Sequence, residues 1–163
     1  MPNDTITKNR VDELEEKMRL HIHNRFDGTE YISVANIDTK EIQIIVLDPT
    51  VALSVGDGKA YFRISELLSG MKLIRVGAAV VTASSSGTPT IQIARIRGGS
   101  ATDMLLTKIT LDANEVDSST AAISAVIDSA NNELKTADQI RIDIDVAGTG
   151  TKGLMITLEL RYM

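Results

Sequence analysis

The 163-residue sequence contains no cysteine, which excludes disulfide bonds, thiolate metal sites and thiol catalysis. It also lacks tryptophan, and only 3% of its residues are aromatic. Sites for sugars, single-stranded nucleic acids and drug-like ligands generally use the flat apolar surface of aromatic rings. No apolar run approaches the roughly 18 residues that a membrane-spanning helix needs. These shortages speak against several classes of binding protein and against a membrane protein.

The charge balance is acidic, with a net charge of −5 and a pI of about 5.0. Such a field repels a phosphate backbone, and the sequence has no cluster of lysine and arginine to overcome it locally. The first ten residues, MPNDTITKNR, lack the hydrophobic stretch of a secretory signal. We therefore expect a protein that binds neither nucleic acid nor membranes and is made in the cytoplasm of the producing cell.

The residue pattern divides the chain into a flexible arm over residues 1–8, a helix with a connecting segment over 9–30, and a β domain over 31–163. Asn9 is a suitable N-cap, and apolar residues then recur every three or four positions, which predicts a helix. The apolar stripe is narrow and about two heptads long, too short for the helix to be stable alone in water. We interpret it as a docking element whose interface candidates are Val11, Leu14, Met18, His21, Ile22, His23 and Phe26.

Beyond residue 30 the apolar residues recur at every second position, which is typical of antiparallel strands with one buried face. One helical turn is expected over residues 65–69, and residues 118–133 fit either a helix or a long loop. The pattern predicts about seven to nine strands in an antiparallel, jelly-roll-like β-sandwich, hence a mainly β fold preceded by a short N-terminal α-helix. The alternating runs are Ile42, Ile44 and Val46; Ile74, Val76, Ala78 and Val80; Ile91 and Ile93; Ile140, Ile142, Ile144 and Val146; and Leu154, Ile156, Leu158, Leu160 and Tyr162.

Two patterns in the β domain have the residue types of a chemical site. Residues 56–59 (GDGK) lack the first glycine and the Ser/Thr of a phosphate-binding loop, so we interpret them as a hairpin turn before a strand. Asp143 and Asp145 share a strand face and could do acid–base work or bind a hard cation. Arg141 lies on the same face, however, and this favours a solvent-exposed charged face.

The sequence has two histidines, His21 and His23. On a helix their rings diverge, so they could not share a metal. In an extended segment both rings fall on one side, where the pair could chelate a metal, or the pairs of three chains could bind one together. A single pair of this kind is a weak signal, and packing where the helix meets the β domain is the alternative. We expect no metal, no cofactor and no catalytic residue, and therefore a protein that is not an enzyme.

Two stretches of the sequence resemble virion proteins of tailed bacteriophages. His21-Ile22-His23-Asn24, followed by residues 27–30 (DGTE) and Ile32, is similar to a segment that recurs in these proteins. Residues 55–64 (VGDGKAYFRI) resemble a phage structural domain that commonly follows that segment. The likeness covers most of residues 21–162 and continues through Leu67, Gly70, Met71, Leu73, Asp103, Met104, Leu105, Thr107, Lys108, Ile127, Asp128, residues 138–143 (DQIRID), Lys152, Gly153 and Leu154.

The resemblance implies a non-enzymatic β-sandwich subunit of a phage particle, usually a homotrimer. It could be a capsid decoration (cement) protein, a head fibre or a tail-fibre module. A short arm before the β domain, and nothing after it, favour a decoration protein on the outer capsid surface of the virion. Such a protein would bind the major capsid protein or another virion protein. The alternatives are a receptor-binding module for a host cell-surface glycan and, less in keeping with the sequence, an enzyme such as a depolymerase.

Overall fold

The computed structural model describes residues 39–162, and these belong to one compact unit that begins at Thr39. The arm predicted over residues 1–8, the helix and connecting segment over 9–30, and the first residues of the predicted β domain lie outside the described residues. The predicted mainly antiparallel β character of the domain is confirmed, because every paired strand in the described part is antiparallel.

The described residues form ten strands, slightly more than the sequence pattern predicts, because several are only two to four residues long. The helical turn expected over residues 65–69 is present as the 3₁₀ helix η2 (Glu66–Leu68). Residues 118–133 form mostly loop, with the 3₁₀ helix η3 (Ser118–Thr120) near the start. The strands are β1 (Thr39–Ala52), β2 (Gly56–Arg63), β3 (Lys72–Thr82), β4 (Thr90–Arg97), β5 (Ser100–Asp103), β6 (Leu105–Thr107), β7 (Ile109–Thr110), β8 (Val126–Ile127), β9 (Gln139–Val146) and β10 (Lys152–Arg161).

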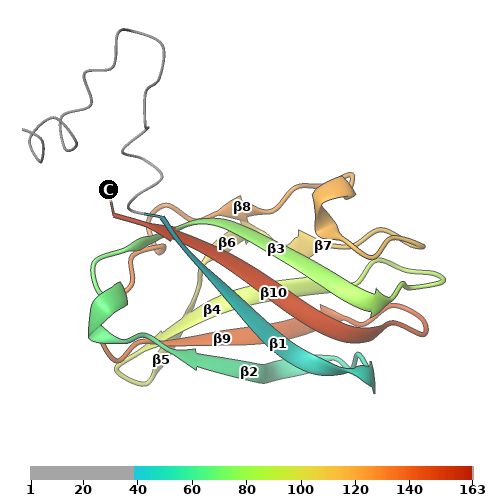
Figure 1. Ribbon diagram of the computed structural model, residues 1–163, viewed down its shortest axis with the longest axis horizontal. Helices are drawn as coiled ribbons and strands as arrows, with labels where there is room; N and C mark the ends of the chain where they lie inside the picture. Colours follow the sequence, from blue (N-terminus) through green and yellow to red (C-terminus); the bar gives the residue numbers. More distant parts are fainter. Residues whose placement is uncertain (1–38, 163) are drawn as a thin grey trace, which may run out of the picture. The chain divides into compact units, whose positions relative to one another are not determined.

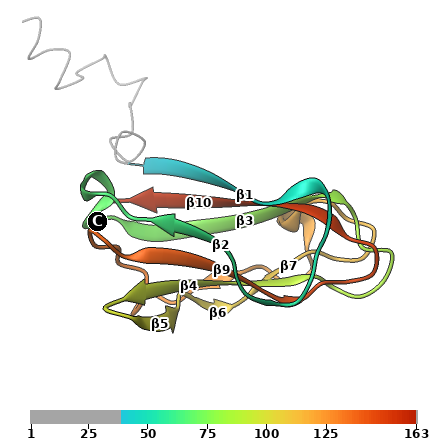
Figure 2. The ribbon, with the colours of Figure 1, turned by 90° about the horizontal axis from the view of Figure 1, so that it is seen from below.

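The strands assemble into two larger sheets and one two-stranded ribbon. The first sheet has the order β1-β10-β3, and the second has the order β2-β9-β4-β5, with β7 also paired to β4. Strands β6 and β8 form the ribbon. Figure 2 shows β1, β10 and β3 as one layer above β9, β4 and β5, which gives a sandwich-like arrangement. Figure 1 shows β3 at the side of the first sheet that faces β6, β7 and β8.

The core lies between the two layers and follows the predicted alternation closely. In β10, the side chains of Leu154, Ile156, Leu158 and Leu160 are buried, and so are the alternating isoleucines of β9 and β4. Fully burying one such side chain stabilises a fold by roughly 1.5–3 kcal/mol. At the last residue of two of the predicted runs, the side chain is exposed rather than buried. Val146 and Tyr162 are exposed, because each stands at or beyond the end of its strand, where the opposite layer no longer covers it.

Residues 56–59 do not form the predicted hairpin turn; they lie within β2 as a bulge. Gly56 is paired with Ile144 and Ala60 with Ile142, so three residues of β2 lie opposite the single residue Asp143. Gly58 has φ 68°, a left-handed conformation that favours glycine, and a Cβ atom there would collide with the ring of Tyr61. The glycines therefore allow the strand to bulge towards its neighbour.

Asp143 is buried, with an exposed fraction of 3%, so the prediction of a solvent-exposed charged face is wrong at this residue. Its Oδ1 accepts a hydrogen bond from the Gly58 N–H at 2.7 Å, and its Oδ2 accepts two from the Arg141 guanidinium, the shorter at 2.7 Å. Asp145, two residues on, is exposed as predicted and forms an ion pair with Lys108 at 2.8 Å. The β2 bulge covers Asp143 and its backbone satisfies the carboxylate, which alternation along β9 alone does not reveal.

A second buried carboxylate, Asp138, ties the loop before β9 to β4. Its two oxygens accept hydrogen bonds from Arg97 Nε at 2.8 Å and Nη2 at 2.6 Å, and one also accepts the Lys135 N–H at 2.7 Å. Arg95 donates to the carbonyls of Asn131 and Glu133. Burial alone raises the pKa of Asp138, but the hydrogen bonds from Arg97 and Lys135 and the charges of both arginines hold this pKa below its ordinary value.

We expect Asp138→Asn to destabilise the domain by about 1–3 kcal/mol, because the Arg97 guanidinium loses its charged partner. A carboxyl whose pKa is lowered by folding stabilises the fold above its unfolded pKa, and the contribution is lost as the pH falls through the folded value. The stability difference between the native protein and the variant should therefore narrow below about pH 3.9. Urea unfolding of both proteins, followed by circular dichroism from pH 7 to pH 2, measures this difference in unfolding free energy.

Asp145→Asn is the matched control, since it removes a carboxylate from an exposed ion pair and should cost less than about 1 kcal/mol. An equal cost for the two variants, or a difference that widens at low pH, would contradict the role given to Asp138.

Candidate functional site

Strand β3 forms one edge of the first sheet, and within residues 39–162 its outer edge is covered only at its two ends. At one end, the Leu73 N–H donates to the Asn132 carbonyl at 2.9 Å. At the other, the Val80 N–H donates to the Val116 carbonyl at 2.8 Å, and the Ala78 N–H donates to Ser118 Oγ at 2.8 Å. Between these attachments lies a stretch of edge over residues 74–77.

The backbone of Val76 faces outward from the sheet in this stretch. The N–H groups of Ala78 and Val80 point away from β10, and the direction of the backbone groups alternates along a strand, so those of Val76 point the same way. No hydrogen bond from the loops of the described chain reaches Val76. Ile74 has no partner on β10, because Arg75 is paired with Glu159 and Leu73 with Leu160, which makes a β-bulge at this point.

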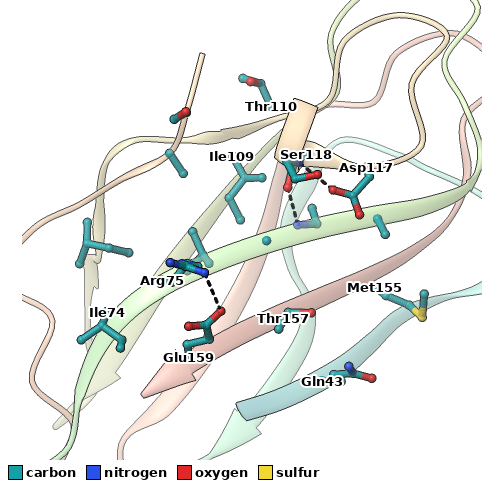
Figure 3. A pocket seen from close by; sticks show the side chains of 18 of the residues that line it. Gln43, Ile74, Arg75, Ile109, Thr110, Asp117, Ser118, Met155, Thr157 and Glu159 are labelled. Carbon is teal, nitrogen blue, oxygen red and sulfur yellow. Dashed lines mark hydrogen bonds and ion pairs between the residues drawn. The ribbon is translucent and has the colours of Figure 1, made fainter. Parts of the chain in front are cut away.

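A groove with a cavity volume of about 650 Å³ runs along this stretch of β3 (Figure 3). This volume lies within the range of roughly 300–1,000 Å³ that is common for ligand sites. The lining combines six consecutive residues of β3 with the outer face of the first sheet and with the loops around β7, η3 and β8. The side chains that line it include Gln43, Ile74, Arg75, Val76, Ile109, Thr110, Asp117, Ser118, Ser119, Ile123, Ser124, Ala125, Ile127, Met155, Thr157 and Glu159.

The centre of the groove floor is formed by one row of uncharged residues. Gly77 of β3 is paired with Thr157 of β10, and Thr157 is paired with Gln43 of β1, so these three residues form one row across the sheet. A Cβ atom placed on Gly77 would have Ser118 Oγ as its nearest neighbour, at 3.9 Å. The glycine is therefore not required by close packing, and its missing side chain leaves the groove deeper.

Charged residues line the groove on both sides. Arg75 and Glu159 form an ion pair at 3.5 Å on the floor, as Figure 3 shows. Asp117 caps η3 by accepting the Ser119 N–H at 2.7 Å, and hydrogen bonds from the Ser119 side chain and backbone lower its pKa. Two carboxylates thus face one guanidinium along the lining, so the groove carries excess negative charge.

Next to the groove, the outer face of the first sheet is apolar. Ile45, Met155 and Ala79 form the row beside the Gln43 row, and Val81 follows Ala79 by two residues on β3. The exposed fractions are 72% for Ile45, 44% for Met155 and 55% for Val81. We call Ile45, Ala79, Val81 and Met155 the sheet patch. Exposed apolar residues that adjoin in this way mark interaction surfaces more often than isolated ones do.

The interface candidates inferred from the sequence, Val11 to Phe26, lie outside the described residues, as do both histidines of the possible metal pair. In residues 39–162, no three histidine, aspartate or glutamate side chains cluster in a way that could hold a metal ion. No helix in this part of the chain is long and apolar enough to cross a membrane. The sequence analysis missed the groove: its one local signal is the run of small residues Gly77, Ala78 and Ala79 within a strand.

Comparison with known proteins gives no relative for this chain: no family model, no curated protein and no solved structure matches it.

We expect Ser118→Ala to loosen the groove wall, because the hydroxyl that accepts the Ala78 N–H is lost. An unsatisfied backbone donor costs about 1–3 kcal/mol, and the Ala78 amide should exchange faster with deuterium. Ser124→Ala is the control, since Ser124 lines the same groove and its hydroxyl makes no hydrogen bond to the described part of the chain. Unchanged exchange at Ala78 in the Ser118 variant would show that the wall is held by other contacts.

Proposed function

We propose that this chain is a non-catalytic structural subunit of a tailed-bacteriophage particle, a decoration protein that binds the outer capsid surface as a homotrimer. The sequence resemblance over residues 21–162 supports two parts of this proposal: that the particle is a phage particle, and that the subunit is a trimer. The mode of action is energetic. Contacts that bridge neighbouring subunits raise the free energy needed to separate them, and each buried Å² of apolar surface contributes about 25 cal/mol.

We further propose that the domain is a jelly roll. In a jelly roll two four-stranded antiparallel sheets are connected as two Greek keys. The order β2-β9-β4-β5 in one sheet and β1-β10-β3 in the other supports this proposal, because consecutive strands of the chain lie in opposite sheets: β1 and β2, β3 and β4, and β9 and β10. Among the described residues, the first sheet has one strand fewer than such a fold expects.

The single observation that carries the subunit proposal is the sheet patch. Ile45 has more than two-thirds of its surface exposed although it lies within β1, paired with Met155 just before a β-bulge, where a polar residue would serve a solvated face better. Met155 and Val81 extend the same apolar surface across two further strands. An apolar face on a rigid sheet is suited to contact with another protein surface, and a glycan site would instead be expected to offer aromatic rings.

The test is binding to particles. Phage particles from the producing strain, stripped of the protein, are incubated with the purified chain and sedimented, and the bound protein is quantified. We expect saturable binding and a higher temperature of particle disruption. Ile45→Glu should weaken binding or self-association at least 10-fold, since it places a charge in the apolar contact. Light scattering of the purified protein gives the oligomeric state.

Leu67→Glu is the matched control, because Leu67 is a highly exposed apolar residue of η2 and is not part of the sheet patch. It should leave binding unchanged. If Ile45→Glu bound particles and self-associated like the native chain, the sheet patch would have no part in assembly. If the protein were found on host cells rather than on particles, the decoration role would be wrong.

A further inference from the structure

We propose that the groove along β3 binds an extended polypeptide segment with basic side chains, which adds to the first sheet as a strand beside residues 74–77. This inference goes beyond the particle role. It rests on the edge of β3 and on the charges of the groove lining, and it holds for any partner that presents such a segment.

The edge of β3 has backbone groups to which a further strand can bind. An edge strand offers unpaired N–H and C=O groups, and proteins normally cover it, shorten it or protect it with charges. Here the loops at Asn132, Val116 and Ser118 cover both ends of the edge, yet the backbone groups of Val76 between them face the groove. A peptide in an extended conformation can pair with such a position, and its backbone hydrogen bonds supply affinity that does not depend on sequence.

The order of the strands in the two sheets also points to this edge. The second sheet continues beyond β4 to β5 and β7, whereas the first sheet ends at β3. The groove lies on this side of the sandwich, where Ile109 of β7 and Ile127 of β8 contribute apolar lining behind the edge. An added strand would place alternate side chains on this apolar lining and on the outer face, as a strand of the sheet does.

The charges of the lining identify the chemistry of the occupant. Glu159 on the floor and Asp117 beside η3 are both carboxylates of the groove lining, and Arg75 neutralises only one of them. A segment with lysine or arginine at its outward-facing positions therefore fits the groove better than an acidic one, whereas Met155 and Ala79 suit an apolar residue at the other end.

The experiment uses the full chain and a capped, fluorescein-labelled hexapeptide of sequence Val-Thr-Val-Lys-Val-Lys, whose two lysines fall on one face of an extended strand. Fluorescence polarisation measures its affinity, and amide exchange followed by NMR reports on the Val76 N–H. We expect binding that weakens with salt, and protection of the Val76 amide on binding. A peptide with two glutamates in place of the lysines should bind at least 10-fold more weakly. A peptide N-methylated at every residue should lose binding, since it cannot donate to a strand.

Gly77→Val is the blocking variant. Gly77 has room for a Cβ atom, so the valine should leave the fold stable while its methyl groups fill the floor, and binding should fall at least 10-fold. Ala101→Val, on the exposed strand β5, is the matched control and should bind the peptide like the native chain. Glu159→Gln should retain binding but reduce the preference for lysine over glutamate.

Equal binding by Gly77→Val, no protection of Val76, or retained binding of the N-methylated peptide would overturn the proposal. Self-association of the purified chain that Gly77→Val abolishes would also overturn it, because a second copy would then occupy the groove. The particle test depends on Ile45 and the peptide test on Gly77, so failure of one proposal can be told apart from failure of the other.

Discussion

The edge of β3 is the constraint around which this side of the domain is arranged, because no hydrogen bond from the rest of the described chain reaches the outward-facing backbone of Val76. A strand in the interior of a sheet satisfies its N–H and C=O groups on both sides, whereas an edge strand must leave one side to loops, to solvent or to another chain. β3 uses loops at both ends: Asn132 reaches it from the segment before β9, and Val116 and Ser118 reach it from the segment around η3. The stretch of β3 that these loops do not cover borders the groove.

The loops can cover β3 because buried carboxylates hold neighbouring parts of the chain in place. Asp138 and the two arginines of β4 fix residues 131–138, which carry Asn132 to the edge of β3. On the opposite side of the second sheet, Asp143 holds the β2 bulge through the Gly58 N–H. A buried carboxylate is costly unless donors satisfy it, and here each has both a guanidinium and a backbone N–H. The attachment of Asn132 at one end of the β3 edge is therefore anchored by a buried carboxylate.

Much of the sheet core can be predicted from the sequence, because alternation is a local property. Leu154, Ile156, Leu158 and Leu160 are buried as their spacing predicts, and the same holds for Ile140, Ile142 and Ile144. Asp143 could not be predicted in this way. Its burial depends on a bulge that begins at Gly56, far away in the sequence, and a local reading of residues 56–59 favours a turn over a bulge. The interface candidates from Val11 to Phe26 stay predictions.

The groove was beyond the reach of sequence analysis for a related reason. Whether an edge is open depends on which distant segments return to it, and the residues that partly cover β3 come from positions 116–118 and 132. The small residues Gly77, Ala78 and Ala79 signal a gap in side-chain volume, but they do not say whether the gap is buried or open. Only the sheet order, which ends at β3, shows that Gly77 faces a groove.

The sheet patch and the groove are neighbouring parts of one face, and they are suited to different kinds of partner surface. The sheet patch offers an apolar surface that a flat, rigid partner surface can cover, and the groove offers backbone groups and negative charge that suit a single extended segment. A partner that used both would combine a hydrophobic contact with a strand in register, and the second contact would become intramolecular once the first had formed. Two modest contacts on one rigid sheet can thus give a firm attachment, which is what the proposed structural role requires.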